Sequence, residues 1–138
     1  MNKQELRTYY KSLRNKLSCD DIEAKSLDIA NRLLTLDIWQ HSFYHVFLSI
    51  EEQKEVQTHF LLNILSGKDK HIVVSKSDFS NHSLIHFLLT DGTLIKKNAN
   101  NIPEPVDGIE VTATKIDVVF VPLLAFDNAG NRVGYGKG

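Results

Sequence analysis

Cysteine and proline are scarce in this chain of 138 residues, and so is excess charge: it has one cysteine, three prolines and a formal net charge of -1. A lone Cys19 cannot close an intrachain disulfide, which fits a reducing compartment, so we expect a cytoplasmic protein. No apolar run approaches membrane-spanning length, and no signal peptide precedes the first amphipathic segment. The near-neutral charge argues against a protein built chiefly to bind nucleic acid. We expect neither membrane nor nucleic acid as a partner.

Length and hydrophobic periodicity predict one α/β domain over residues 1–138. Three helices are expected, over about residues 3–17, from Ser18 onward and from about 56 to 67, where Gly67 closes the last one. Ser18 followed by Asp21 resembles a capping box. Strands are expected at residues 43–50, 72–74, 83–89 and 117–124. Helices alternating with apolar strands favour a layered domain with a largely parallel central sheet flanked by helices.

The end of the chain is its most informative segment. Four of the seven glycines fall at positions 130–138, interleaved with Arg132 and Lys137, directly after the predicted strand at 117–124. Glycines leave backbone N–H groups uncovered, and a Gly-rich cationic loop after a strand is a common phosphate site. Asn131 stands where a Walker A motif needs its first glycine, so the segment is not that motif. The alternative is a solvated turn whose lysine is incidental.

Other polar residues allow two interpretations each. Pro103 and Pro105 stiffen the backbone around Glu104, which is either a rigid surface turn or a carboxylate presented to a heterocycle. Glu55 either caps the third helix or points into a crevice at the strand ends. The basic stripe of the first helix is a solvated face unless that helix packs beside the terminal loop. The histidine pairs at 41 and 45 and at 82 and 86 lie in non-helical segments, too far apart for tight metal chelation.

Three stretches together resemble the 5-formyltetrahydrofolate cyclo-ligase family, also called 5,10-methenyltetrahydrofolate synthetases. Residues 3–7 look like the family's Lys-x-x-x-Arg segment, and residues 102–105 look like its Pro-Glu-Pro turn. Residues 120–138 look like its specific signature, from Phe120 through the glycines to Lys137 and Gly138. The resemblance implies the family's fold, which is related to NagB, RpiA and CoA transferases. It also implies an ATP-dependent ligase that converts 5-formyltetrahydrofolate to 5,10-methenyltetrahydrofolate.

The resemblance also assigns roles to residues. It implies an ATP site made of Lys3, Gln4, Glu5, Leu6, Arg7, Arg132, Val133, Gly134, Tyr135, Gly136, Lys137 and Gly138. It implies a folate site made of Ile50, Glu55, Glu104, Tyr135, Gly136, Lys137 and Gly138. Lys137 and Arg132 would be the catalytic cations. No residue of this chain is predicted as a metal ligand, although the family reaction uses Mg²⁺ with ATP.

Family members continue beyond the last glycine with further residues, including acidic contacts to Mg²⁺, so we expect a domain that lacks its C-terminal part. We expect a monomer whose partners are ATP and a reduced folate. Two other functions stay open: a non-catalytic remnant that binds nucleotide or folate, and an α/β enzyme acting on a phosphorylated sugar.

Overall fold

The computed structural model describes residues 1–78 and 80–135. Three helices lie in the first half of the chain: α1 (Lys3–Asn15), α2 (Cys19–Leu33) and α3 (His59–Gly67). The side chain of Asn2 caps α1 by accepting a hydrogen bond from the Glu5 N–H at 2.8 Å. Ser18 and Asp21 form the predicted capping box at the start of α2, each side chain bonding to the backbone of the other. The helices are therefore confirmed, and side-chain caps set the starts of α1 and α2.

The central sheet has four strands in the order β3 (Ser83–Leu88), β2 (His71–Asp78), β1 (Phe43–His45) and β6 (Val118–Val119). Strand β1 runs parallel to both of its neighbours, with Tyr44 opposite Ile72 and Val118. Strand β3 pairs antiparallel to β2 over its whole length. This mixed α/β architecture with a largely parallel sheet is the one that the sequence predicts, except that β3 returns as a hairpin.

The main core lies between this sheet and α3. Tyr44, Val46 and Ile72 from the sheet pack with Leu61 and Leu65 from the helix, and Tyr44, Val46 and Leu65 are completely buried. The Tyr44 hydroxyl keeps a partner in this apolar setting because it donates to the Ile38 carbonyl at 2.7 Å. Side chains alternate along a strand, so His45 and Ser75 point to the opposite face of the sheet.

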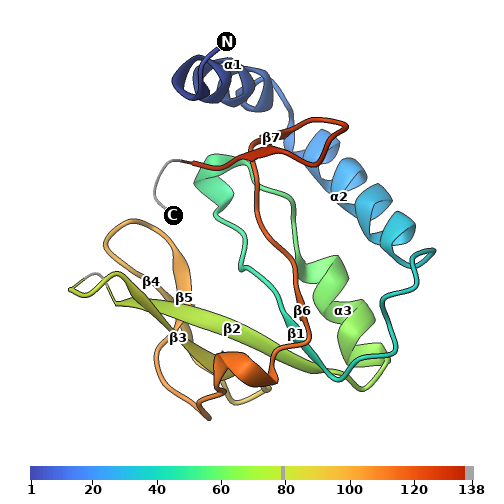
Figure 1. Ribbon diagram of the computed structural model, residues 1–138, viewed down its shortest axis with the longest axis vertical. Coiled ribbons are helices and arrows are strands. Elements are labelled where there is room, and N and C mark those ends of the chain that lie inside the picture. The colour runs from blue at the N-terminus through green and yellow to red at the C-terminus, as the bar shows by residue number, and fades with distance from the viewer. Residues whose placement is uncertain (79, 136–138) are drawn as a thin grey trace.

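Two small hairpins complete the described chain. Strand β4 (Ile95–Lys97) pairs antiparallel with β5 (Pro103–Pro105), and β5 packs against β2. Strand β7 (Ala125–Phe126) pairs with β8 (Arg132–Val133). Short 3-10 turns occupy Glu51–Gln53 (η1) and Ala113–Lys115 (η2). In Figure 1 the blue helix α1 stands beside the red β7 segment, away from the central sheet.

Three predictions about the strands are wrong in detail. Residues 103–105 are not a turn, because extended proline-rich backbone pairs with β4. The strand predicted at 43–50 stops at His45, and the one predicted at 117–124 stops at Val119. Val46 and Phe120 each donate one further backbone hydrogen bond, to the carbonyls of Val73 and His45, and the apolar residues beyond them do not continue the ladder. The start of the glycine-rich segment is itself a hairpin, turning through Asp127 to Gly130, where Gly130 has φ of 87°.

Candidate functional site

Helix α1 lies directly against the terminal segment. The Arg7 Nε donates a hydrogen bond to the Gly134 carbonyl at 3.0 Å. Two helical turns further along α1, Arg14 donates from Nη2 to the Leu123 carbonyl at 3.2 Å and from Nη1 to the Tyr135 hydroxyl. The packing of the first helix beside the terminal loop, which spacing alone could not establish, is present. The basic stripe is thus more than a solvated face.

Two cations converge on Gly134. A side-chain carbon added to Gly134 would lie 3.8 Å from Nη1 of Arg132, so the exposed Arg132 side chain reaches back over this glycine. The half-buried Arg7 approaches the same residue from α1. Positive charge beside a backbone without side chains is suited to an anion. This arrangement immediately precedes Gly136, Lys137 and Gly138, which lie outside the described residues.

The other residues predicted for the ATP site lie around this point. Lys3, Gln4 and Glu5 are exposed in the first turn of α1, Leu6 is half-buried, and Val133 is half-buried on β8. Gln4, Arg7 and Lys11 line a shallow hollow of about 580 Å³ along α1. Of the predicted set, the structure brings Arg7, Arg132, Gly134 and Tyr135 together most closely, and no hydrogen bond joins Lys3 to the terminal segment among residues 1–78 and 80–135.

A second, smaller cavity gathers the residues predicted for the folate. It has a volume of about 180 Å³, and its walls include Ile50, Glu55 and Tyr135 together with His45 and Ser75. Glu55 does not cap α3, whose N-cap is Thr58. Of the two interpretations of Glu55, the crevice is therefore the one that the structure shows. Ile50 supplies an apolar wall beside it.

Glu55 is a buried carboxyl, with 5% of its surface exposed. Its Oε1 accepts a hydrogen bond from the Ile50 N–H at 3.0 Å. Burial raises the pKa of Glu55, while the Ile50 hydrogen bond and the positive charge of Arg14 act in the opposite direction. A carboxylate held in this way can accept hydrogen bonds from a ligand that enters the cavity.

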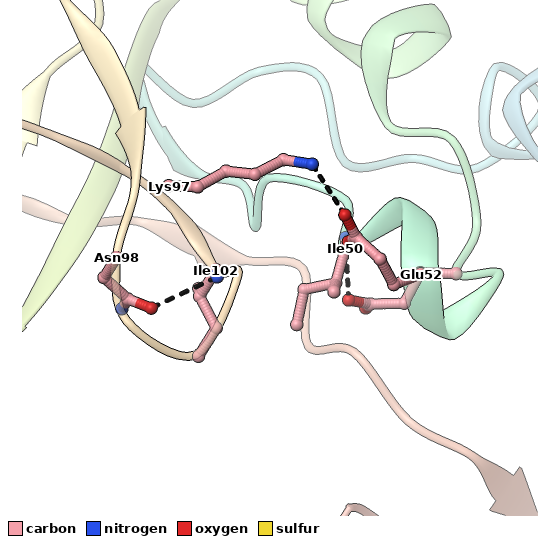
Figure 2. A network of polar contacts seen from close by, with 6 residues as sticks. Ile50, Glu52, Lys97, Asn98 and Ile102 are labelled. Carbon is pink, nitrogen blue, oxygen red and sulfur yellow. Dashed lines mark hydrogen bonds and ion pairs between the residues drawn. The ribbon is translucent and has the colours of Figure 1, made fainter.

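Glu104 does not line this cavity. Its Oε2 accepts a hydrogen bond from the Ser77 N–H at 3.2 Å, which ties β5 to β2. Its neighbours Ile102 and Pro103 contribute to the cavity wall instead. In Figure 2 the hairpin that carries them is joined to the η1 turn by Lys97, whose Nζ lies 2.7 Å from Oε1 of Glu52. This exposed ion pair links two walls of the cavity, although such pairs add little stability.

The sequence analysis missed His45 and Ser75. The Ser75 hydroxyl lies 2.6 Å from Nε2 of His45 and 2.6 Å from Nδ1 of His86, so one serine bridges two histidines on neighbouring strands. The histidines were considered as pairs four residues apart, whereas the sheet pairs His45 with His86 across β2. Burial, and then the charge of His86, lowers the pKa of His45, whose buried Nδ1 has no hydrogen-bond partner among the described residues. Side chains alternate between the two faces of a strand, and this alternation was the sequence signal that could have placed His45, Ser75 and His86 on one face of the sheet.

Neither a cluster of potential metal ligands nor a membrane-spanning helix occurs in the described part of the chain. Residues 1–78 and 80–135 contain no group of three or more His, Cys, Asp or Glu side chains able to hold a metal ion. We assign no step to a metal ion held by these residues. No helix among them is long and apolar enough to cross a membrane.

Fold and site together define a mixed α/β protein in which two arginines converge on a glycine near a small cavity. A sequence model described as the 5-formyltetrahydrofolate cyclo-ligase family matches residues 1–138. The chain belongs to this family.

Relatives and solved structures agree with this assignment. The 5-formyltetrahydrofolate cyclo-ligase of Haemophilus influenzae is 27% identical, over 99% of this chain and 74% of its own length. That of Mus musculus is 28% identical, over 99% and 70% respectively. The 5,10-methenyltetrahydrofolate synthetase of Aquifex aeolicus superposes with a TM-score of 0.83 at 27% identity, over 100% of this chain and 69% of that one. A Mycoplasma pneumoniae structure, at 18% identity and a TM-score of 0.72 over 100% and 74%, shares the fold.

Proposed function

We propose that this protein catalyses the ATP-dependent cyclisation of 5-formyltetrahydrofolate to 5,10-methenyltetrahydrofolate, releasing ADP and phosphate. Family membership gives the reaction its class. The single observation that carries the site is the convergence of Arg7 and Arg132 on Gly134, next to the cavity that holds Glu55. We expect a monomer that works in the cytoplasm.

The chemistry requires activation of a poor leaving group. Transfer of the γ-phosphoryl group of ATP to the N-formyl oxygen gives an iminium phosphate. N10 of the folate then attacks the formyl carbon, its proton leaves, and the carbon–oxygen bond breaks to release phosphate. Phosphoryl transfer needs alignment and charge neutralisation more than a protein nucleophile.

The residues divide between these two needs. Arg7, Arg132 and Lys137 neutralise the polyphosphate, while the N–H groups of the glycines from 134 to 138 bind its oxygens. Lys3, Gln4, Glu5, Leu6 and Val133 shape the nucleotide side of the site. Glu55 anchors N–H groups of the pterin, and Ile50 and Tyr135 pack beside it. Mg²⁺ would accompany ATP as its phosphate-bound counter-ion.

The test measures the ATP-dependent rise of methenyl-folate absorbance. Arg7→Ala and Arg132→Ala should each weaken ATP binding roughly 10- to 150-fold, because each variant loses one charge-assisted hydrogen bond of about 1.5–3 kcal/mol. Lys137→Ala should abolish turnover. Arg32→Ala is the matched control, because Arg32 is an exposed arginine on α2 whose ion pair among the described residues is with the exposed Asp28.

Three results would change the proposal. Unimpaired turnover with Arg132→Ala and Lys137→Ala combined would remove the phosphate role from the terminal segment. Ligand-induced stabilisation by ATP or folate without any product would indicate a binding remnant instead. Stabilisation by sugar phosphates and none by folate would favour the other enzyme class.

A further inference from the structure

Two histidines and a serine form a hydrogen-bonded group on one face of the central sheet. The Ser75 hydroxyl on β2 lies 2.6 Å from Nε2 of His45 on β1 and 2.6 Å from Nδ1 of His86 on β3. The two rings stand nearly perpendicular, with 5.6 Å between their centres. His45 and Ser75 also line the cavity of about 180 Å³ that contains Glu55. The group therefore belongs to the wall of the cavity to which the proposed function assigns the folate.

The serine has a single proton to donate, so it determines where the two rings carry theirs. If Ser75 donates to Nδ1 of His86, then Nε2 of His45 carries a proton and donates to Ser75, and Nδ1 of His45 is an unprotonated acceptor. The reverse arrangement places an N–H at that buried Nδ1, which has no hydrogen-bond partner among residues 1–78 and 80–135. A buried N–H without an acceptor is rarer than a buried acceptor with an idle lone pair, which favours the first arrangement.

His45 is a neutral base in this cavity. Burial, and then the charge of His86, lowers the pKa of His45, so the ring is uncharged near pH 7. The cavity wall has two other ionisable groups, Glu55 and Tyr135, and burial raises the pKa of each. Tyr135 therefore keeps its proton, and Glu55 is engaged by the Ile50 N–H at 3.0 Å. A neutral imidazole with a free lone pair is the group best suited to accept a proton here.

We propose that Nδ1 of His45 accepts the proton that N10 of the folate releases, and that Ser75 and His86 are positioning residues. The inference rests on the proposed function, in which this proton has no named acceptor. N10 becomes positively charged when it attacks the formyl carbon. The N10–H bond then breaks, its electron pair stays on N10 and the proton joins Nδ1. That electron pair expels phosphate as the carbon–oxygen bond breaks. His45 is left as an imidazolium, which returns its proton to solvent after the product leaves.

The first test measures kcat and kcat/KM against pH by methenyl-folate absorbance. His45→Gln should lower kcat about 100- to 10,000-fold, the usual contribution of a general base. The decline of kcat/KM below about pH 6.5, expected in the wild type, should disappear in this variant, whereas His41→Gln, at an exposed histidine, should keep both. Added imidazole should restore part of the activity of His45→Ala. Wild-type activity in His45→Gln, a persisting acid decline, or a loss that imidazole does not relieve would overturn the inference.

The serine is tested by a pair of variants. Ser75→Ala removes the hydroxyl that fixes the proton of His45 on Nε2, so kcat should fall, although less than in His45→Gln. Ser75→Thr keeps a hydroxyl at the same position and should retain more activity than Ser75→Ala. Equal activity in the two variants would remove the positioning role from Ser75.

A further measurement needs no ligand. Nitrogen-15 NMR of the imidazole rings above pH 7 should show an unprotonated Nδ1 and a protonated Nε2 for His45, and Ser75→Ala should lose this preference. A protonated Nδ1 in the wild type would overturn the inference. If the wild type forms methenyl-folate and the His45 variants match it, the inference fails and the proposed function stands. If the wild type forms none, the proposed function fails, and the inference fails with it.

Discussion

Glu55→Gln should move stability and ligand affinity in opposite directions. The substitution keeps an amide oxygen that can accept the 3.0 Å hydrogen bond from the Ile50 N–H, and it removes the charge of a buried residue, of which 5% is exposed. Burial is the largest influence on this carboxyl and raises its pKa, which means that the fold disfavours the ionised form. Loss of the attraction to Arg14 offsets only part of the gain.

The sign of the pH dependence follows from that direction. The folded pKa lies above the unfolded value of about 4.5, so the cost of ionised Glu55 is absent below that value. The cost grows as the pH rises through the folded pKa. The free energy of unfolding of Glu55→Gln should therefore exceed that of the wild type at pH 7.5, and the two should approach each other near pH 4. Urea denaturation followed by circular dichroism measures both.

Folate affinity should fall in the same variant. An ionised carboxylate accepting N–H groups contributes about 1.5–3 kcal/mol per charge-assisted bond, so the Kd should rise roughly 10- to 150-fold. Glu51→Gln removes a charge from the same loop at an exposed position and should change neither quantity. A Glu55→Gln protein that is less stable than the wild type at pH 7.5 would show that the Ile50 bond and Arg14 outweigh burial, and would refute the reasoning.

Two further predictions concern the main core and the sheet. Leu65→Ala should lower the free energy of unfolding by about 2–5 kcal/mol, because Leu65 is completely buried in the main core, while Leu36→Ala at a 51% exposed position should change it by less than about 0.5 kcal/mol. His45→Gln should make the free energy of unfolding less dependent on pH on the acid side of neutrality. The pKa of His45 is lowered in the fold, so the unfolded chain binds its proton first and wild-type stability declines as the pH falls below about 6.5. Equal acid profiles for the two proteins would contradict this.

Local signals in the sequence predicted the helices and their order because their causes are local. The Ser18–Asp21 capping box and the apolar spacing of α1 and α2 act within a few residues, so the chain itself displays them. The four strands of the central sheet were located but their ends were not, and the short strands of the two hairpins were not predicted. An apolar run reports burial, whereas a strand ends where its partner ends, and the partner of β1 is set by tertiary packing.

The site divides in the same way. Residues gathered in a motif, such as Arg132 and Gly134, were identifiable, and the resemblance supplied Glu55 and Ile50. Ser75 could not be predicted from the sequence, because its contacts to His45 and His86 form only when β2 places it between the two histidines. Glu104 was misjudged for a related reason: stiff extended backbone suits an exposed turn and a paired strand equally well, and only the presence of β4 distinguishes them.

The two outer strands β5 and β6 differ in their capacity to recruit another chain. Strand β5 carries Pro103 and Pro105, which have no N–H to offer to an incoming strand. Strand β6 ends the described sheet and leaves Val119 54% exposed on an apolar margin. An edge strand with an apolar side chain favours pairing with a further strand, and a lysine at position 119 would oppose such pairing.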